Sequence, residues 1–191
     1  MFRVFARLEA NGDVRNPVVQ PILSTRYALR LARASLEATL RATRYRLPPN
    51  VPVDLTTRRA GVFVTLVRAG KLRACWGTLE PQQTHLAAEI VAAAQGVCTR
   101  DTRFPPLRAE ETNRLKLILT VVLTPPQPAH ASQILPREHG VMLRCGKRSA
   151  VVLPHEGRTV RRLIELARQK AGSAPEESVE IYTFRVQTIR E

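Results

Sequence analysis

The apolar run from Leu115 to Leu123 constrains the fold of this chain more than any other segment does. One lysine and one threonine interrupt its nine residues, and several of the others are β-branched. The run is far shorter than the about 20 residues that a membrane-spanning helix needs, and β-branched side chains favour strands. Pro125 and Pro126 follow and end it, because proline cannot donate to a β-ladder. The run therefore predicts a buried strand, and a chain that is 44% hydrophobic can bury a core around it.

The patterns on either side of this run predict two related units, each a β-hairpin followed by a helix. Ser24, Thr84 and Thr159 are suitable N-caps for three helices, and Gly96 stands just beyond the expected end of the second. The expected elements are a helix over 24–44, strands over 61–68 and 71–77, a helix over 84–94, a strand over 115–123, strands over 140–146 and 148–154, a helix over 159–171 and a strand over 179–187. We therefore predict an α+β fold, with helices packed on a mainly antiparallel sheet.

At 191 residues the chain has the length of one domain, or of two small ones that share a core. We expect residues 1–23, which contain two prolines, to be an N-terminal extension and residues 24–191 to form the domain. The N-terminus lacks the long apolar block and small-residue cleavage site of a signal peptide. Cys75, Cys98 and Cys145 are odd in number and widely spaced, so we expect no disulfide framework and a reducing cytoplasm. Because the apolar runs are too short for a membrane span, we expect no association with a membrane.

The chain is strongly basic, with 26 Arg, 4 Lys and 16 acidic residues, a formal net charge of +14 and a pI near 11.2. This charge permits binding to nucleic acid through neutralisation of phosphates. However, the arginines are spread along the whole chain, no run of four basic residues occurs, and aromatic residues make up only 5%. Base stacking needs exposed aromatic side chains. We therefore rank an ordinary basic surface ahead of nucleic-acid binding and keep the second as an alternative.

The best candidate for chemistry is the segment that contains Arg73, Cys75, Gly77 and Thr78. If residues 71–77 form a strand, alternation places Arg73 and Cys75 on one face, about 6.5–7 Å apart. A guanidinium beside a thiol favours the thiolate, which is the nucleophilic and metal-binding form. Gly77 and Thr78 would let a ligand approach the backbone. The alternative is that Cys75 is a small buried apolar side chain, and spacing alone favours it because no histidine is placed beside this cysteine.

Two further residues are candidates for ligand binding. Arg103, in a loop fixed by two consecutive prolines, would either hold an anion in a cleft or clamp the loop to the sheet, and we weigh the two equally. His139 would approach the Arg73–Cys75 face, although a loop histidine bonded to the backbone is the favoured interpretation. No His pair at i, i+4, no Cys pair at i, i+3 and no glycine-rich phosphate loop occurs. We therefore expect neither a metal nor a bound cofactor.

Eight blocks of the sequence resemble the AMMECR-one domain family, in the family's order and over about residues 24–191. They are Gly61-Val-Phe-Val-Thr-Leu66, Leu72-Arg-Ala-Cys-Trp-Gly-Thr-Leu79, Asp101-Thr-Arg-Phe-Pro-Pro-Leu107, Val122-Leu-Thr-Pro-Pro126, His139-Gly-Val141, Leu153-Pro154, Arg168-Gln-Lys-Ala-Gly172 and Tyr182-Thr-Phe184. The resemblance implies an α+β fold of two interlocked sub-domains over residues 24–191. It implies no established activity, and it names Memo-like and radical-SAM proteins as partners in a shared modification pathway.

The sequence departs from the family's characteristic block, Leu-Arg-Gly-Cys-Ile-Gly, at two positions. Ala74 replaces the inner glycine, and alanine disfavours the positive φ that glycine adopts freely. Trp76 replaces isoleucine, which adds volume on the core-facing side and requires local repacking. The family's usual cysteine in the last helix is also absent, and Ala167 or Gln169 stands near its place.

Two functions remain open at this stage. In the first, the Arg–Cys segment lines a catalytic or ligand-binding cleft, in which Arg73 orients or activates Cys75 and Arg103 holds an anion. Further candidate ligand contacts are Gly77, Thr78 and His139. In the second, the chain is a non-catalytic adaptor or a nucleic-acid-binding module, and binding to nucleic acid would weaken steeply between low and physiological salt.

Overall fold

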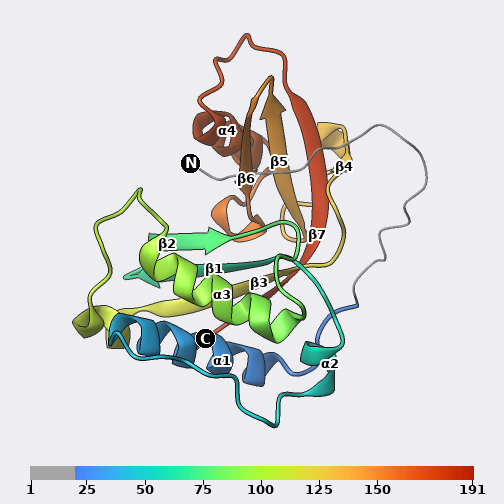
Figure 1. Cartoon of the computed structure of the whole chain (residues 1–191). Helices are drawn as coiled ribbons and strands as arrows, with labels where there is room; N and C mark the ends of the chain where they lie inside the picture. The colour runs from blue at the N-terminus through green and yellow to red at the C-terminus, as the bar shows by residue number, and fades with distance from the viewer. Residues whose placement is uncertain (1–19) are drawn as a thin grey trace. The chain divides into compact units, whose positions relative to one another are not determined.

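The computed structural model describes residues 20–191 (Figure 1). Most of the predicted N-terminal extension, residues 1–19, lies outside the described residues. The described chain divides into two compact units. The N-terminal unit contains residues 20–123 together with 187–191, and the C-terminal unit contains residues 124–186.

Three antiparallel strands form the sheet of the N-terminal unit, namely β1 (Val62–Arg68), β2 (Lys71–Gly77) and β3 (Lys116–Val122). β1 pairs with both of the others, and β2 lies at the edge. Ala69 and Gly70 join β1 to β2 with φ values of 48° and 75°, the pair of positive φ angles typical of a two-residue hairpin turn. The apolar run is β3, and its alternate leucines are completely buried, so the predicted buried strand is confirmed.

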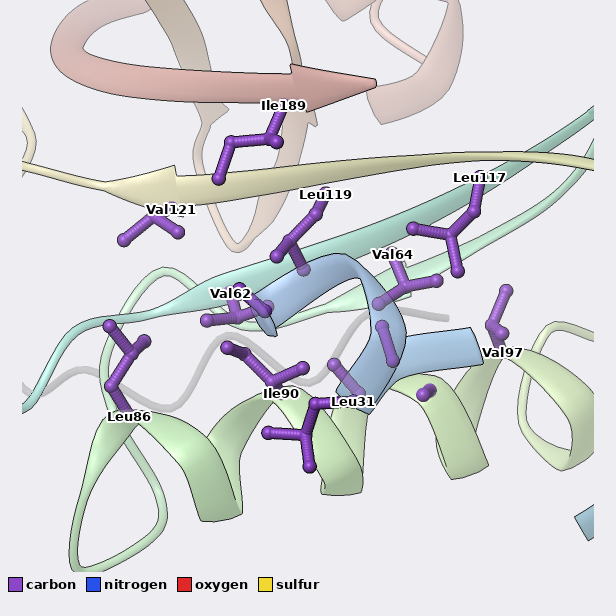
Figure 2. Packing of buried hydrophobic residues seen from close by; sticks show 14 of the residues in the cluster. Leu31, Val62, Val64, Leu86, Ile90, Val97, Leu117, Leu119, Val121 and Ile189 are labelled. Carbon is purple, nitrogen blue, oxygen red and sulfur yellow. The ribbon is translucent and has the colours of Figure 1, made fainter. Parts of the chain in front are cut away.

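The core of this unit lies between its helices and one face of its sheet. The helices are α1 (Thr25–Leu40), the short α2 (Val53–Thr56) and α3 (Leu86–Thr99), and a 3-10 helix spans Ala109–Arg114. Figure 2 shows Ile90 of α3 and Leu31 of α1 beside Val62 of β1 in one apolar cluster. Alternate residues of the strands enter this cluster because successive side chains of a strand point to opposite faces. Cys75 of β2 lies opposite Thr65 of β1, and the register of the two strands shifts at Arg73, which has no partner in the ladder.

One of the three predicted N-caps is wrong, and Ser24 stands at the predicted N-cap position of α1. The hydroxyl of Ser24 makes no capping bond and donates instead to Asp54 Oδ1 at 2.8 Å, and α1 ends at Leu40 rather than near residue 44. The second helix begins after His85, whose Nδ1 accepts the Ala88 N–H at 3.2 Å, so Thr84 is not its cap. That helix continues to Thr99, and Gly96 therefore lies inside it.

The C-terminal unit repeats the hairpin-plus-helix pattern. Its strands are β4 (Gln127–Pro128), β5 (His139–Cys145), β6 (Arg148–Val152) and β7 (Glu180–Arg190), whose last residues belong to the N-terminal unit. β7 pairs with β4 and β5, and β5 pairs with β6, all antiparallel. Two 3-10 turns span Ala131–Gln133 and Pro154–Glu156.

Helix α4 (Val160–Ala171) packs on β5 and β6 through an apolar cluster that contains Leu163 and Ala167. Thr159 caps it by accepting the Arg162 N–H at 3.2 Å, and Gly172 ends it with a φ of 63°. This third cap was predicted correctly. The predicted α+β fold with a mainly antiparallel sheet is confirmed in both units. Among residues 20–191 the structure contains no helix with the length and apolarity of a membrane span.

Candidate functional site

Side chains from the loop after α3 cover the outer edge of β2. The Cys75 N–H donates to Asp101 Oδ2 at 2.7 Å, and Arg103 Nη2 donates to the Cys75 carbonyl oxygen at 3.0 Å. Asp101 and Arg103 also bond each other, with Nε–Oδ1 and Nη2–Oδ2 distances of 2.8 Å. An acidic and a basic side chain thus satisfy both main-chain groups of Cys75 that point away from β1. Because an open edge strand invites pairing with another chain, this loop closes the edge at Cys75.

The pKa of Asp101 reflects this position. Burial of the carboxyl group raises its pKa. The hydrogen bonds from Arg103 and the Cys75 amide, together with the charge of Arg103, lower this pKa by a larger amount. The net pKa lies below the usual value, so Asp101 is ionised at neutral pH. The Arg103 guanidinium also lies 5.6 Å from the centre of the Phe104 ring. These are the contacts expected of a clamp that holds the loop to the sheet.

Arg73 joins the same loop to β2 two residues earlier. Its Nε and Nη2 donate to the two carboxylate oxygens of Glu111 at 2.9 and 2.8 Å. Its Nη1 and Nη2 also donate to the carbonyl oxygens of Pro105 and Pro106 at 3.0 and 3.2 Å. Both side chains of the ion pair are about 85% buried, with exposed fractions of 15% and 14%. The hydrogen bond from Arg73 is the largest cause of the lowered pKa of Glu111.

The thiol of Cys75 is buried, with 8% of the residue exposed. Thr65 lies opposite Cys75 in the β1–β2 ladder, and its hydroxyl donates to Cys75 Sγ at 3.2 Å. Because the main-chain groups of Cys75 point away from β1, the two residues form a non-hydrogen-bonded pair, the kind whose side chains lie closest. The structure thus brings Arg73, Cys75 and Arg103 together around one loop.

Gly77 and Thr78, at the end of β2, contact other parts of the N-terminal unit. A Cβ at Gly77 would lie 2.1 Å from the Val62 carbonyl oxygen, so the missing side chain makes room for the β1 backbone. The Thr78 hydroxyl donates to Glu89 Oε1 at 3.0 Å.

Glu89 is a residue that the sequence analysis missed. It is 3% exposed, and its Oε2 accepts the backbone N–H groups of Gln82 and Gln83 at 2.7 and 2.8 Å. One buried carboxylate therefore bonds three residues, Thr78, Gln82 and Gln83, of the connection from β2 to α3. The position of Glu89 in the sequence indicates its burial. Glu89 follows Leu86 by three residues and precedes Ala93 by four, so it lies on the apolar face of the helix.

The two departures from the family block fit this structure. Ala74 is buried in the core, and its φ is not among the positive values found for non-glycine residues in the described chain. Trp76 packs against α3 at Gly96, where a Cβ would lie 2.2 Å from the ring carbon Cδ1. The glycine expected beyond the helix lies inside it, and its missing side chain leaves space for the indole ring. Arg100 lies over the same ring, 5.8 Å from its centre.

His139 belongs to the C-terminal unit, at the start of β5. Its Nδ1 accepts the Leu135 N–H at 3.2 Å, which is the backbone contact favoured for a loop histidine. The approach of His139 to the Arg73–Cys75 face stays a prediction.

The other cysteines are also thiols, and no disulfide forms. Burial raises the pKa of the Cys98 thiol to about 11. Cys145 is 6% exposed, and Arg148 Nη2 donates to its sulfur at 3.4 Å. Within residues 20–191, no three His, Cys, Asp or Glu side chains are grouped as a metal site requires.

Comparison with known proteins identifies relatives of this chain. A protein from Thermotoga maritima is 40% identical over 144 residues, which cover 72% of this chain and 82% of that protein. A protein from Methanothermobacter thermautotrophicus is 36% identical over 128 residues, which cover 66% of this chain and 64% of that protein. The crystal structure of an uncharacterised protein from Pyrococcus horikoshii matches with a TM-score of 0.77 at 27% identity, over 87% of this chain and 91% of that one. The family model AMMECR1 matches residues 29–189. The chain belongs to the AMMECR1 family.

Proposed function

We propose that this chain is a cytoplasmic, non-catalytic adaptor, and that its domain, residues 24–191, uses the loop from Asp101 to Glu110 as a rigid contact surface for a partner protein. The observation that carries the proposal is the bonding of Arg73, Cys75 and Arg103. Their polar groups hold this loop against β2 through Asp101 and Glu111. Such bonding preorganises a surface, which lowers the entropic cost of binding.

The exposed part of the loop suits a protein partner. Thr102, Pro105, Pro106 and Arg108 are exposed, and the two prolines lack amide hydrogens that would need partners in an interface. No described acidic side chain lies within 4 Å of the Arg108 guanidinium, so its charge is available to a partner. The partners that the family resemblance implies are Memo-like and radical-SAM proteins, in a shared modification pathway.

The burial of Cys75 supports the non-catalytic part of the proposal, since a nucleophilic thiolate must be accessible to its substrate. Cys145 offers a matched comparison because both residues are less than 9% exposed. We expect iodoacetamide to alkylate Cys75 no faster than Cys145 near neutral pH, as measured by peptide mass spectrometry of the native protein. Alkylation of Cys75 that is severalfold faster would overturn the non-catalytic assignment.

A second candidate function is the catalytic or ligand-binding cleft, with Cys75 as nucleophile or ligand contact. The hydrogen bond from the Thr65 hydroxyl to Cys75 Sγ favours it, because a donor to sulfur stabilises the thiolate. Fast alkylation of Cys75, abolished in the Thr65→Val variant, would support this function.

Binding itself is tested with purified Memo-like and radical-SAM proteins from the same organism. We expect the Arg108→Glu variant to weaken binding to one of them by about tenfold, which corresponds to about 1.4 kcal/mol. Arg137→Glu is the control, because Arg137 is also exposed, lies in the C-terminal unit and undergoes the same charge reversal. Equal effects of the two variants would show a general electrostatic attraction and would count against the loop surface.

Nucleic acid is the remaining alternative partner for so basic a chain. If the chain binds nucleic acid, its retention on an immobilised RNA or DNA oligonucleotide should fall steeply between low and physiological salt. We expect no saturable binding of either oligonucleotide by the wild-type protein at physiological salt.

A further inference from the structure

A shallow groove of about 530 Å³ lies along the solvent-facing side of α1, the blue helix of Figure 1. Leu29 and Ala34 contribute its apolar floor, and Arg26 and Arg30 lie toward the N-terminal end of the helix. Glu37 lines the other end. This groove is distinct from the Asp101–Glu110 loop and lies wholly within the N-terminal unit.

The charges of the groove are only partly compensated. Arg33 is neutralised by Glu191, whose carboxylate accepts from Nε at 2.9 Å and from Nη2, and Arg33 also donates to the Leu115 carbonyl oxygen. Within residues 20–191, no acidic side chain lies within 4 Å of Arg26 or Arg30. The Arg30 guanidinium is held over the Tyr27 ring, 5.7 Å from its centre.

Glu37 makes the groove asymmetric. Among the described residues its carboxylate has no basic partner within 4 Å. The groove therefore has a positive end, an apolar middle and a negative end. The positive charge of the α1 N-terminus adds to that of Arg26 and Arg30.

We propose that this groove binds a short acidic–apolar peptide segment of a partner protein. Carboxylates of the segment would pair with Arg26 and Arg30, one apolar side chain would cover Leu29 and Ala34, and a basic or neutral residue would lie near Glu37. Glu37 follows Arg26 by eleven positions of α1, a rise of about 16.5 Å. About five residues of extended chain span that length.

The same charges argue against a nucleic acid in this groove. A phosphate backbone carries a negative charge at every step and would meet the carboxylate of Glu37 in the groove. A peptide can vary its charge along its length and so match all three parts. The inference goes beyond the proposed function, because it concerns another surface and holds whether or not the Asp101–Glu110 loop binds a partner.

The test uses the full chain and a fluorescein-labelled peptide of sequence Glu-Asp-Glu-Leu-Ala-Leu-Gly-Lys, followed by fluorescence anisotropy. We expect saturable binding that the Arg26→Glu/Arg30→Glu variant weakens by at least about tenfold. The control is Arg137→Glu/Arg158→Glu, which makes the same change in net charge at exposed arginines of the C-terminal unit. Thermal unfolding of each variant checks that it is folded.

Two further variants distinguish a peptide from an oligonucleotide as the molecule that binds in the groove. Glu37→Lys should weaken binding of the peptide because it repels the peptide's lysine, whereas it would strengthen binding of an oligonucleotide. Ala34→Gln should weaken peptide binding by filling the floor, and it leaves the charge unchanged. The proposal would be overturned if peptide binding did not saturate at about 1 mM peptide, or if both double variants weakened it equally. It would also be overturned if an oligonucleotide bound the wild type more tightly than the peptide does, and bound the Glu37→Lys variant more tightly still.

Discussion

The indole ring of Trp76 occupies the space that a side chain at Gly96 would need. The glycine lies in the interior of α3, and a Cβ there would come within 2.2 Å of Cδ1 and 2.5 Å of Nε1 of the ring. A glycine in the middle of a helix is unfavourable when taken by itself. Together Trp76 and Gly96 form one packing unit, in which the small residue compensates for the large one.

We expect Gly96→Ala to lower the free energy of unfolding by about 1–3 kcal/mol, because the new methyl group overpacks the core. In an isolated helix the same change is stabilising by about 1 kcal/mol. In a Trp76→Ile background the ring is absent, so Gly96→Ala should be neutral or stabilising. Urea unfolding of the wild type, the two single variants and the double variant measures this coupling. Equal destabilisation in both backgrounds would show that the ring is not the cause.

The side chain of Asp101 protects the outward-facing amide of Cys75 from solvent exchange. We expect Asp101→Ala to speed hydrogen exchange at Cys75 severalfold, because the amide loses its 2.7 Å acceptor. Amides of β1, in the middle of the three strands, serve as internal controls and should keep their rates. The measurement is amide exchange by NMR. Unchanged exchange at Cys75 would mean that the loop contributes nothing to closing this edge.

Glu89 provides a test of buried polar bonding. Glu89→Ala should lower the free energy of unfolding by about 3 kcal/mol, because two backbone N–H groups and the Thr78 hydroxyl lose their acceptor. Glu89→Gln should cost less, since its amide oxygen can still accept the two N–H groups and its NH₂ group can donate to the hydroxyl oxygen. Thermal and urea unfolding of both variants give the comparison, and an equal loss in the two would contradict this assignment of bonds.

Acid should weaken the contacts of the Asp101–Glu111 segment. The pKa values of Asp101 and Glu111 are lowered in the folded chain from ordinary values of 3.8 and 4.5. Their ionised forms therefore contribute stability above these ordinary values, and the contribution is lost as the pH falls through the lower, folded-state values. We expect unfolding measured between pH 7 and pH 2.5 to show a steep loss of stability below about pH 4.5. The Asp101→Asn/Glu111→Gln variant should flatten this loss, and an unchanged slope would contradict the predicted coupling.

Local patterns in the sequence were sufficient for much of the fold. The β-branched run that became β3, the two hairpins and the Thr159 cap were predicted correctly, because each depends on neighbours within a few residues. Two other features depend on residues outside the local sequence. The hydroxyl of Ser24 bonds Asp54, which lies 30 residues away. Gly96 lies inside α3, where the Trp76 ring occupies the space that a side chain would need.

The candidate site divides in the same way. The sequence by itself determined that residues 71–77 form the second strand of a hairpin. That Arg73 and Cys75 share one face of this strand stays a prediction, because the register with β1 shifts at Arg73. Only the tertiary structure decided their partners. Asp101 lies 26 residues from Cys75, and Glu111 lies 38 residues from Arg73. Hydrogen bonds and ion pairs act over about 3–4 Å, so they form only after the chain has packed the loop onto the sheet, and no pattern of neighbouring residues encodes which carboxylate arrives there.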